Sequence, residues 1–215
     1  MDITDVILHQ HDEQRRMFAM LEEYPRADLE GLAALWKRLE ILLETHAEAE
    51  ERYYYPELLK LGTGAADAPS AEDEVHDAVK DHNKIRDAVR KVSDSETGSA
   101  DWWHAVEEAN VQNSDHMGEE ERQDLADFRQ RASLQLRHEV AVAFLRYESL
   151  KAATGVPPED KDPKAYVQDK KPQGTTAREQ QAAAEAEKAA EPGEPVRQTA
   201  AKKTAKMASK ADSQG

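Results

Sequence analysis

The sequence contains no cysteine among its 215 residues. Disulfide bonds and thiolate metal sites are therefore excluded, and any metal must be held by nitrogen and oxygen ligands. No segment approaches the roughly 20 consecutive apolar residues that span a bilayer. The N-terminus also lacks the basic and apolar regions of a signal peptide. We expect a soluble cytoplasmic protein without a membrane partner, because a cysteine-free chain is compatible with a reducing compartment.

Positive charge is scarce in the first part of the chain. Residues 1–150 carry 17 Lys+Arg against 34 Asp+Glu, a net charge of −17, whereas residues 151–215 carry a net +2. An acidic surface repels a phosphate backbone, so we do not expect the folded part to bind nucleic acid. The acidity suits a protein that collects cations, and it equally suits a surface that is merely well solvated.

Strand-like alternation is also missing, and residues 1–153 show helical periodicity nearly throughout. Short connections between helices favour antiparallel neighbours. The sequence therefore predicts an all-α, up-down four-helix bundle with a fifth helix. Pro56 falls inside the second helix and should kink it. The predicted helices cover residues 4–23, 29–61, 70–92, 100–129 and 132–153.

The composition changes after residue 153. Residues 154–215 are rich in Ala, Lys, Glu, Gln and Pro and contain few large apolar residues. Such a segment buries too little surface to offset the entropy of ordering, so it is predicted to be a disordered tail. Four lysines between residues 202 and 210 could contact nucleic acid or another acidic surface, but a solubilising tail without a partner is the favoured interpretation.

Histidines interrupt the apolar faces of the first four predicted helices. Each of these helices has one histidine among its core-facing residues, and two of the histidines are followed four residues later by a glutamate on the same face. A carboxylate that faces a core is costly unless a cation pairs with it, and a metal supplies that cation. Imidazole and carboxylate ligands suit iron, zinc or manganese. The histidines are His11, His46, His82 and His116, and the glutamates are Glu50 and Glu120.

The other four histidines, His9, His76, His104 and His138, do not share these faces and are expected to be surface or ordinary structural residues. A lone histidine on an apolar face is more often a core residue than a ligand. The metal-site hypothesis therefore depends on the combination of four such histidines with two glutamates at the same spacing.

The segment HAEAEERYYYPEL, residues 46–58, resembles the second-helix signature of hemerythrin-like (HHE cation-binding) proteins, His-x-x-x-Glu-Glu followed by aromatics, Pro and Leu. HMGEEE at residues 116–121 is similar to the fourth-helix motif, and DHNKI at 81–85 is similar to the third. His11 matches the histidine of the first helix, and the resemblance covers about residues 1–150.

This resemblance implies two non-haem iron ions bridged by carboxylates and a solvent-derived oxygen. Glu50 and Glu120 would be the bridging residues. Zinc accepts the same ligands, so the sequence leaves the metal open. By the same resemblance, the terminal ligands would be His11, His46, His82 and His116.

Two positions depart from the family pattern. Oxygen-carrying hemerythrins have a further histidine four residues before the equivalent of His82, where this chain has Ala78. Two six-coordinate irons then keep about two open positions of about 12, which weakens the oxygen-carrier interpretation. The fourth-helix motif also lacks an aromatic-Pro pair and continues with Gln123, so this helix is expected to run on without a kink.

Three consecutive tyrosines, Tyr53, Tyr54 and Tyr55, follow the second-helix motif. A phenolate from this cluster could occupy an open position on iron, but aromatic packing around the Pro56 kink is favoured. Glu51 and Glu121 could hydrogen-bond ligand histidines. We nevertheless expect these two glutamates to be solvated surface residues.

These features predict a di-iron protein that binds or reacts with oxygen, peroxide or nitric oxide, in oxidative or nitrosative stress. Whether it is an enzyme, for example a catalase-like one, stays open. The alternative is an iron or oxygen sensor, or a metal-binding interaction protein without turnover. A metal-free helical module is disfavoured because it leaves two core-facing glutamates unexplained.

Overall fold

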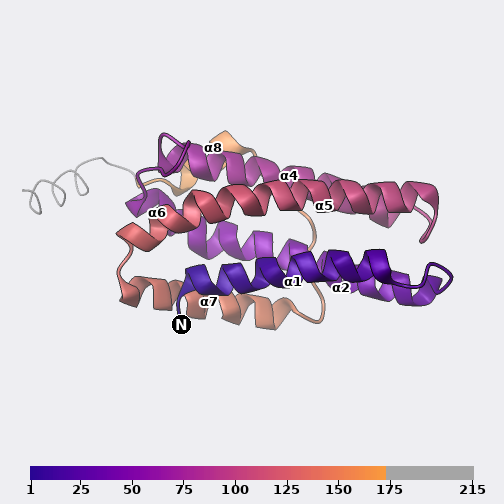
Figure 1. Ribbon diagram of the computed structural model, residues 1–215. Coiled ribbons are helices and arrows are strands. Elements are labelled where there is room, and N and C mark those ends of the chain that lie inside the picture. The colour runs from indigo at the N-terminus through magenta and orange to yellow at the C-terminus, as the bar shows by residue number, and fades with distance from the viewer. Residues whose placement is uncertain (173–215) are drawn as a thin grey trace, which may run out of the picture. The chain divides into compact units, whose positions relative to one another are not determined.

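The structure, a computed structural model, describes residues 1–172, and these residues contain helices and no strand (Figure 1). The prediction of an all-α bundle is confirmed. The elements are α1 (Ile3–Glu23), α2 (Leu29–Ala49), the π-helical turn η1 (Glu50–Tyr54), α3 (Tyr55–Leu61), α4 (Ala71–Asp94), α5 (Ala100–Arg122), α6 (Asp124–Arg131), α7 (Leu134–Lys151) and α8 (Pro163–Lys170).

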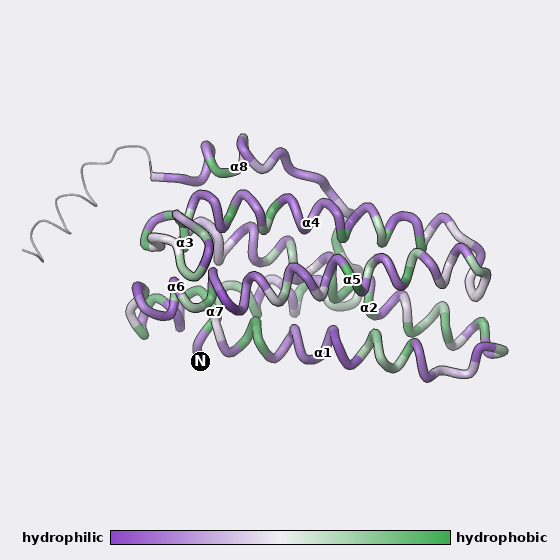
Figure 2. The backbone as a smooth tube through the Cα atoms, turned by 45° about the horizontal axis from the view of Figure 1, so that its top comes forward, coloured by the Kyte–Doolittle hydropathy of each residue, from purple (hydrophilic) through white to green (hydrophobic). Residues whose placement is uncertain are grey.

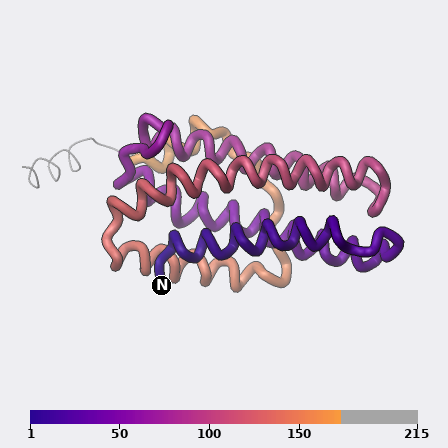
Figure 3. The backbone as a smooth tube through the Cα atoms, in the orientation of Figure 1, coloured from indigo at the N-terminus to yellow at the C-terminus, as the bar shows by residue number. Residues whose placement is uncertain are grey.

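Two antiparallel helical hairpins form the bundle. Figure 3 shows α1 returning as α2 on one side and α4 returning as α5 on the other. The fifth long helix, α7, lies along α1 and α2, and α8 packs on α4. This arrangement places four helices around one interior, so that side chains from all four can meet there.

Most of these helices have a side-chain cap at the N-terminus. Asp and Ser residues satisfy backbone N–H groups that the first helical turn leaves without a partner. At Asp28, which precedes α2, the carboxylate accepts from the backbone N–H of Gly31 at 3.0 Å. The other caps of this kind are Asp2, Ser70, Ser99, Ser133 and Asp162.

The interior consists of two apolar clusters with a polar layer between them. One cluster includes Phe128 and Phe144 near α3, α6 and α7, and the other includes Trp36 and Trp102 near the hairpin turns. Hydrophobic and hydrophilic positions alternate along the long helices (Figure 2), as amphipathic packing requires. The histidines predicted to face the core belong to neither apolar cluster and form the polar layer.

The second predicted helix, residues 29–61, is three elements rather than one kinked helix. At η1 the backbone N–H of Tyr55 bonds to the carbonyl of Glu50, five residues back. Pro56 then lies in the first turn of α3, where a missing N–H costs little. A π-turn therefore accommodates the proline, and it rotates the following residues relative to Glu50.

The fourth predicted helix, residues 100–129, does not continue unbroken. Gln123 has φ −106° and ψ −79°, which ends α5 and begins α6. The side chain of Asp127 in α6 accepts hydrogen bonds from the backbone N–H groups of Thr63 and Gly64 at 2.5 and 2.9 Å. This tertiary contact ties α6 to the loop after α3.

The expected boundary at residue 153 was too early, because residues 163–170 form α8. Tyr166 and Val167 are buried against the bundle, although the segment is otherwise polar. Two apolar residues on one short capped helix are sufficient here because they join the apolar cluster that includes Val75 and Val79 of α4. The rest of the predicted disordered tail, from residue 173, lies outside the described residues.

None of the helices in residues 1–172 combines the length and apolar character that crossing a membrane would require.

Candidate metal centre

The six residues predicted as ligands lie together in the polar layer. Each of the helices α1, α2, α4 and α5 contributes one histidine, η1 contributes Glu50 and α5 also contributes Glu120. All six side chains are almost completely shielded from water. Their exposed fractions are 0% for His11 and Glu50, 1% for His82 and Glu120, and 3% for His46 and His116.

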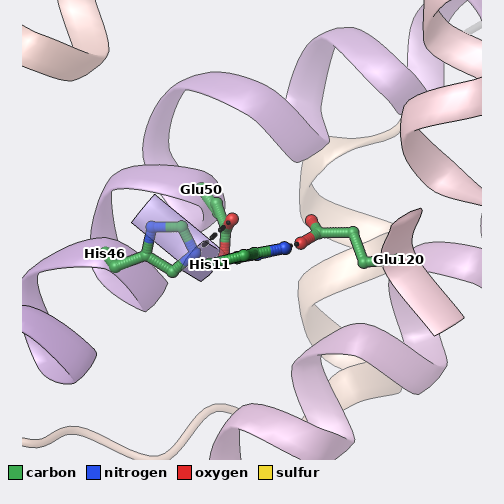
Figure 4. A group of neighbouring side chains, drawn as sticks. All are labelled: His11, His46, Glu50 and Glu120. Atoms are coloured by element: carbon green, nitrogen blue, oxygen red, sulfur yellow. Dashed lines mark ion pairs between the residues drawn. The ribbon is translucent and has the colours of Figure 1, made fainter. Parts of the chain in front are cut away.

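Four of these side chains form a first group (Figure 4). Nε2 of His46 lies 2.9 Å from Oε1 of Glu50, and Nε2 of His11 lies 3.2 Å from Oε2 of Glu120. Figure 4 shows the ring of His11 between Glu50 and Glu120. One ligand atom from each of the four residues lies within 4.8 Å of the others, a spacing that a single cation could bridge.

Glu50 also belongs to a second group, with His82 and His116. Its other oxygen, Oε2, lies 3.2 Å from Nε2 of His82. Nε2 of His82 is in turn 3.1 Å from Nε2 of His116. Two ligand atoms at right angles on a metal with bonds of about 2.1 Å lie about 3.0 Å apart. The two nitrogens are therefore spaced as neighbouring ligands of one metal ion.

Several buried polar atoms of these groups face only one another: within residues 1–172 each has an ion-pair neighbour inside the cluster and no other hydrogen-bond partner. Such atoms are costly in a protein interior, where nearly all buried polar groups form hydrogen bonds of good geometry. Both oxygens of Glu50 are among them. Metal ions would satisfy these atoms, so the residues present fit a pair of metal sites. The other such atoms in the cluster are Nε2 of His11, Nε2 of His46 and Oε2 of Glu120.

The second nitrogen of two of these histidines is bonded to a carboxylate. Nδ1 of His11 lies 2.9 Å from Oε1 of Glu121, and Nδ1 of His82 lies 2.8 Å from Oε1 of Glu51. The expectation that Glu51 and Glu121 are solvated surface residues was therefore wrong for Glu51, whereas the side chain of Glu121 is 28% exposed and still bonds to His11. Glu51 is 1% exposed. A carboxylate on the outer nitrogen orients a metal-binding imidazole and increases its basicity.

His46 has a different partner. Its Nδ1 lies 2.6 Å from Oε1 of Gln10, whose amide nitrogen is 2.5 Å from Oε2 of Glu148 in α7. Gln10 was not predicted, because a polar residue beside His11 carries no recognisable signal in sequence. A signal did exist for Glu51 and Glu121, since each directly follows a predicted ligand glutamate.

Proximity to carboxylates changes the protonation of the histidines. Burial lowers the pKa of His11 and of His82, but hydrogen bonds and the charges of two neighbouring carboxylates outweigh burial and raise each pKa to about 9. The pKa of His116 is lowered, by burial and by the positive charge of His82. Without a cation, protons on His11 and His82 therefore balance the carboxylates.

The pKa values of the two glutamates, Glu50 and Glu120, are shifted in opposite directions. Burial raises the pKa of Glu120, and the negative charge of Glu50 raises it further. Burial would also raise the pKa of Glu50, but the charge of His46 and hydrogen bonds to His46 and His82 lower it well below its usual value. A divalent cation would replace the protons and stabilise both carboxylates as anions.

The π-turn brings Tyr55 into the site. Its hydroxyl lies 3.2 Å from Oε1 of Glu120 and 3.4 Å from Nε2 of His82, and the side chain is completely buried. Tyr53 instead packs on Tyr147 at the bundle surface. Tyr54 packs on Phe128, and its hydroxyl has no hydrogen-bond partner in the described part of the chain. Burial and the surrounding negative charges raise the pKa of Tyr55 well above its usual value.

The histidines predicted to lie outside the site do so. His9, His104 and His138 are exposed and His76 is partly exposed, and none of them joins either group. The structure thus brings together all six predicted ligands and separates them from the other four histidines.

Comparison with known proteins identifies one family. The family model for the hemerythrin HHE cation-binding domain matches residues 2–127, a range that includes all six residues of the two groups and ends before α7. No curated protein and no solved structure matches the chain.

Proposed function

The chain belongs to the hemerythrin HHE cation-binding family, and we propose that it holds two bridged non-haem iron ions that bind or react with oxygen, peroxide or nitric oxide. The observation that carries this proposal is the position of Glu50. Its two oxygens belong to two adjacent groups of ligand atoms, which is what a carboxylate bridging two metal ions requires.

One ion would be held by His11, His46, Glu50 and Glu120, and the other by Glu50, His82 and His116. Nitrogen and carboxylate ligands without sulfur suit iron, and zinc accepts the same set. Iron would supply the redox chemistry and the affinity for diatomic or peroxide ligands.

The protein residues supply three further properties. Nearly complete burial excludes bulk water, so that charges in the site interact strongly. Glu121, Glu51 and Gln10 orient the ligand imidazoles. Tyr55 adds a hydroxyl that can donate a proton to an oxygen in the site. Once deprotonated, the same oxygen could bind the metal ion that His82 would hold.

The second ion would have fewer protein ligands than the first. Ala78, buried one turn before His82, offers no ligand atom at the place of the additional histidine in oxygen-carrying hemerythrins. The open positions therefore favour exchangeable ligands, as in peroxide turnover or reaction with nitric oxide, over reversible oxygen transport. A role in oxidative or nitrosative stress would follow from such chemistry.

A sensor is the second candidate. Loss of metal would leave the carboxylates of Glu50 and Glu120 at the interface of four helices, balanced only by protons on histidine. Metal binding would then stabilise the bundle by a large amount, and a partner could detect the difference. A stability gap between metal-free and iron-loaded protein without turnover of peroxide would favour this function.

Reconstitution tests the proposal. Metal-free protein would be loaded anaerobically with ferrous iron, analysed for metal content, exposed to air or peroxide and followed by visible absorption. We expect about two irons per chain and ferric absorption bands that are absent from the metal-free protein. At most one iron per chain would contradict the di-iron centre. Two irons without peroxide consumption would support the sensor.

A further inference from the structure

The segment after α7 forms a strap that packs on α4 beside the metal centre. We define the strap as residues 156–171, which include α8 and lie beyond the part matched by the family model. The side chain of Asn83 in α4 holds it at two points: its amide nitrogen donates to the carbonyl of Lys161 at 2.7 Å, and its oxygen accepts from the N–H of Lys161 at 3.1 Å. Arg90, also in α4, pairs with Asp160 at 2.6 Å.

The strap brings Lys161 to the carboxylate that orients His82. The ammonium group of Lys161 lies 2.7 Å from Oε2 of Glu48 and is paired directly with Oε2 of Glu51. The other oxygen of Glu51 bonds to Nδ1 of His82 at 2.8 Å. The hydroxyl of Tyr166 in α8 also donates to the backbone carbonyl of Glu51. A continuous chain of contacts thus runs from the strap to a predicted metal ligand.

Glu51 is unlike the other histidine partners in the described chain. Two cations neutralise it, because Arg86 donates to its Oε1 at 3.0 Å and Lys161 pairs with its Oε2. The side chains of Arg86 and Glu51 are buried. Glu121 is paired instead with Arg15, whose side chain is 42% exposed, and Gln10 carries no charge.

We propose that the strap influences the metal centre through Lys161. Lys161 is a positioning residue that acts on His82 through Glu51, and it lowers the affinity of His82 and His116 for their metal ion. This inference rests on the proposed metal centre. It goes beyond that proposal by including a segment outside the matched domain.

The direction of the effect follows from the charges. A carboxylate that accepts the N–H of a ligand imidazole makes the other ring nitrogen a stronger donor to the metal. Lys161 takes up part of the charge of Glu51 and therefore reduces this effect. Its own positive charge, held near the interior where screening is weak, also opposes a bound cation. Removing the charge of Lys161 should therefore tighten the metal ion held by His82.

The rate of metal release tests the inference. Metal-free full-length protein would be loaded anaerobically with Co²⁺, which accepts nitrogen and oxygen ligands, and a chelator would then capture the released ion. We expect Lys161→Gln to slow one of the two release phases by about threefold to tenfold, and Lys161→Arg to behave as wild type. The affected phase should be the one that is missing in His116→Ala.

Arg90→Gln is the matched control, because it removes one positive charge from the contact between α4 and the strap without touching Glu51. It should leave both phases unchanged. Unchanged or faster release from Lys161→Gln would overturn the inference, as would equal slowing in Lys161→Gln and Arg90→Gln. The cobalt content of the wild type separates the two proposals: no bound Co²⁺ rejects the metal centre and this inference together. Two bound Co²⁺ with no effect of Lys161→Gln reject only the role of the strap.

Discussion

The hydroxyl of Tyr55 donates a hydrogen bond to Oε1 of Glu120 across 3.2 Å, and this bond joins the start of α3 to α5 inside the metal centre. The contact exists because η1 contains an i to i−5 hydrogen bond between Tyr55 and Glu50. An extra residue in the turn places Tyr55 on the same side as Glu50, where an α-helix would have placed Tyr53 and Tyr54.

We predict that Tyr55 becomes a ligand when the centre is loaded with ferric iron, because a nearby cation favours the phenolate form of a buried tyrosine. The wild type should then show a phenolate-to-iron absorption band in the visible range. Tyr55→Phe should abolish this band while keeping both irons. Tyr53→Phe is the control and should retain the band, since Tyr53 packs on Tyr147 away from the site. Loss of the band in Tyr54→Phe instead would assign the ligand to the neighbouring side chain.

Replacing Glu50 should lower the metal content per chain more than replacing His116. Glu50 lies in both groups of ligand atoms, whereas His116 lies in one. Glu50→Ala should therefore reduce metal content from about two ions per chain to nearly none, and His116→Ala should reduce it to about one. His104→Ala, at an exposed histidine on the same helix as His116, should change nothing. Metal analysis after gel filtration measures all three variants. Equal losses in Glu50→Ala and His116→Ala would argue against a shared carboxylate.

Metal affinity should rise with pH. In metal-free protein His11 and His82 each have a pKa raised to about 9, from an ordinary value of 6.5, so both hold a proton at neutral pH. A metal ion must displace these protons, and its affinity should increase as the pH rises from about 6.5 to about 9. Titration in a weakly buffered dye solution near neutral pH should show release of about two protons per chain. Release of no protons would show that the two histidines are already neutral.

The raised pKa values of His11 and His82 should also make metal-free protein less stable as the pH rises, whereas metal affinity increases with pH. Because the folded-state pKa of His11 and His82 is raised, their contribution is fully present below about pH 6.5 and is lost as the pH rises through about 9. Urea unfolding of the metal-free protein should show this loss. Metal-loaded protein should not, since its histidines are neutral ligands at both ends of the range.

The apolar cluster near the hairpin turns should contribute stability without affecting metal content. Leu39 is fully buried in that cluster, beside Trp36 and Trp102. Leu39→Ala should reduce the free energy of unfolding by about 2–5 kcal/mol, from lost burial and the resulting cavity. Leu29→Ala, at a position that is 50% exposed, should cost much less. Urea unfolding measures both, and metal analysis should find about two ions per chain in each variant.

For His82, the sequence predicts burial but not the partner of its second ring nitrogen. Its position on an apolar helical face and its place in the family pattern both predict that it faces the core, and it does. The environment of its second nitrogen was not predictable in the same way. Glu51 follows Glu50 in an acidic segment, and sequence cannot distinguish a solvated glutamate from one that α4 and the strap enclose.

The backbone irregularities show a similar division. Pro56 correctly marks an interruption of the helix, but a kink and a π-turn are both compatible with a proline there. The break at Gln123 has no proline or glycine to indicate it, and it precedes a helix that contacts the loop after α3 through Asp127. Likewise, Tyr166 and Val167 are too few to predict a packed helix.

The sequence by itself determined the four amphipathic helices, the histidine on each buried face and the two glutamates that share those faces, because helical periodicity is a local property of the chain. Only the tertiary structure decided that Glu50 lies between two groups of ligands, that Tyr55 enters the site and that Lys161 reaches Glu51. Those relations join residues from different helices, and their geometry depends on how the helices pack and on where the π-turn rotates the chain.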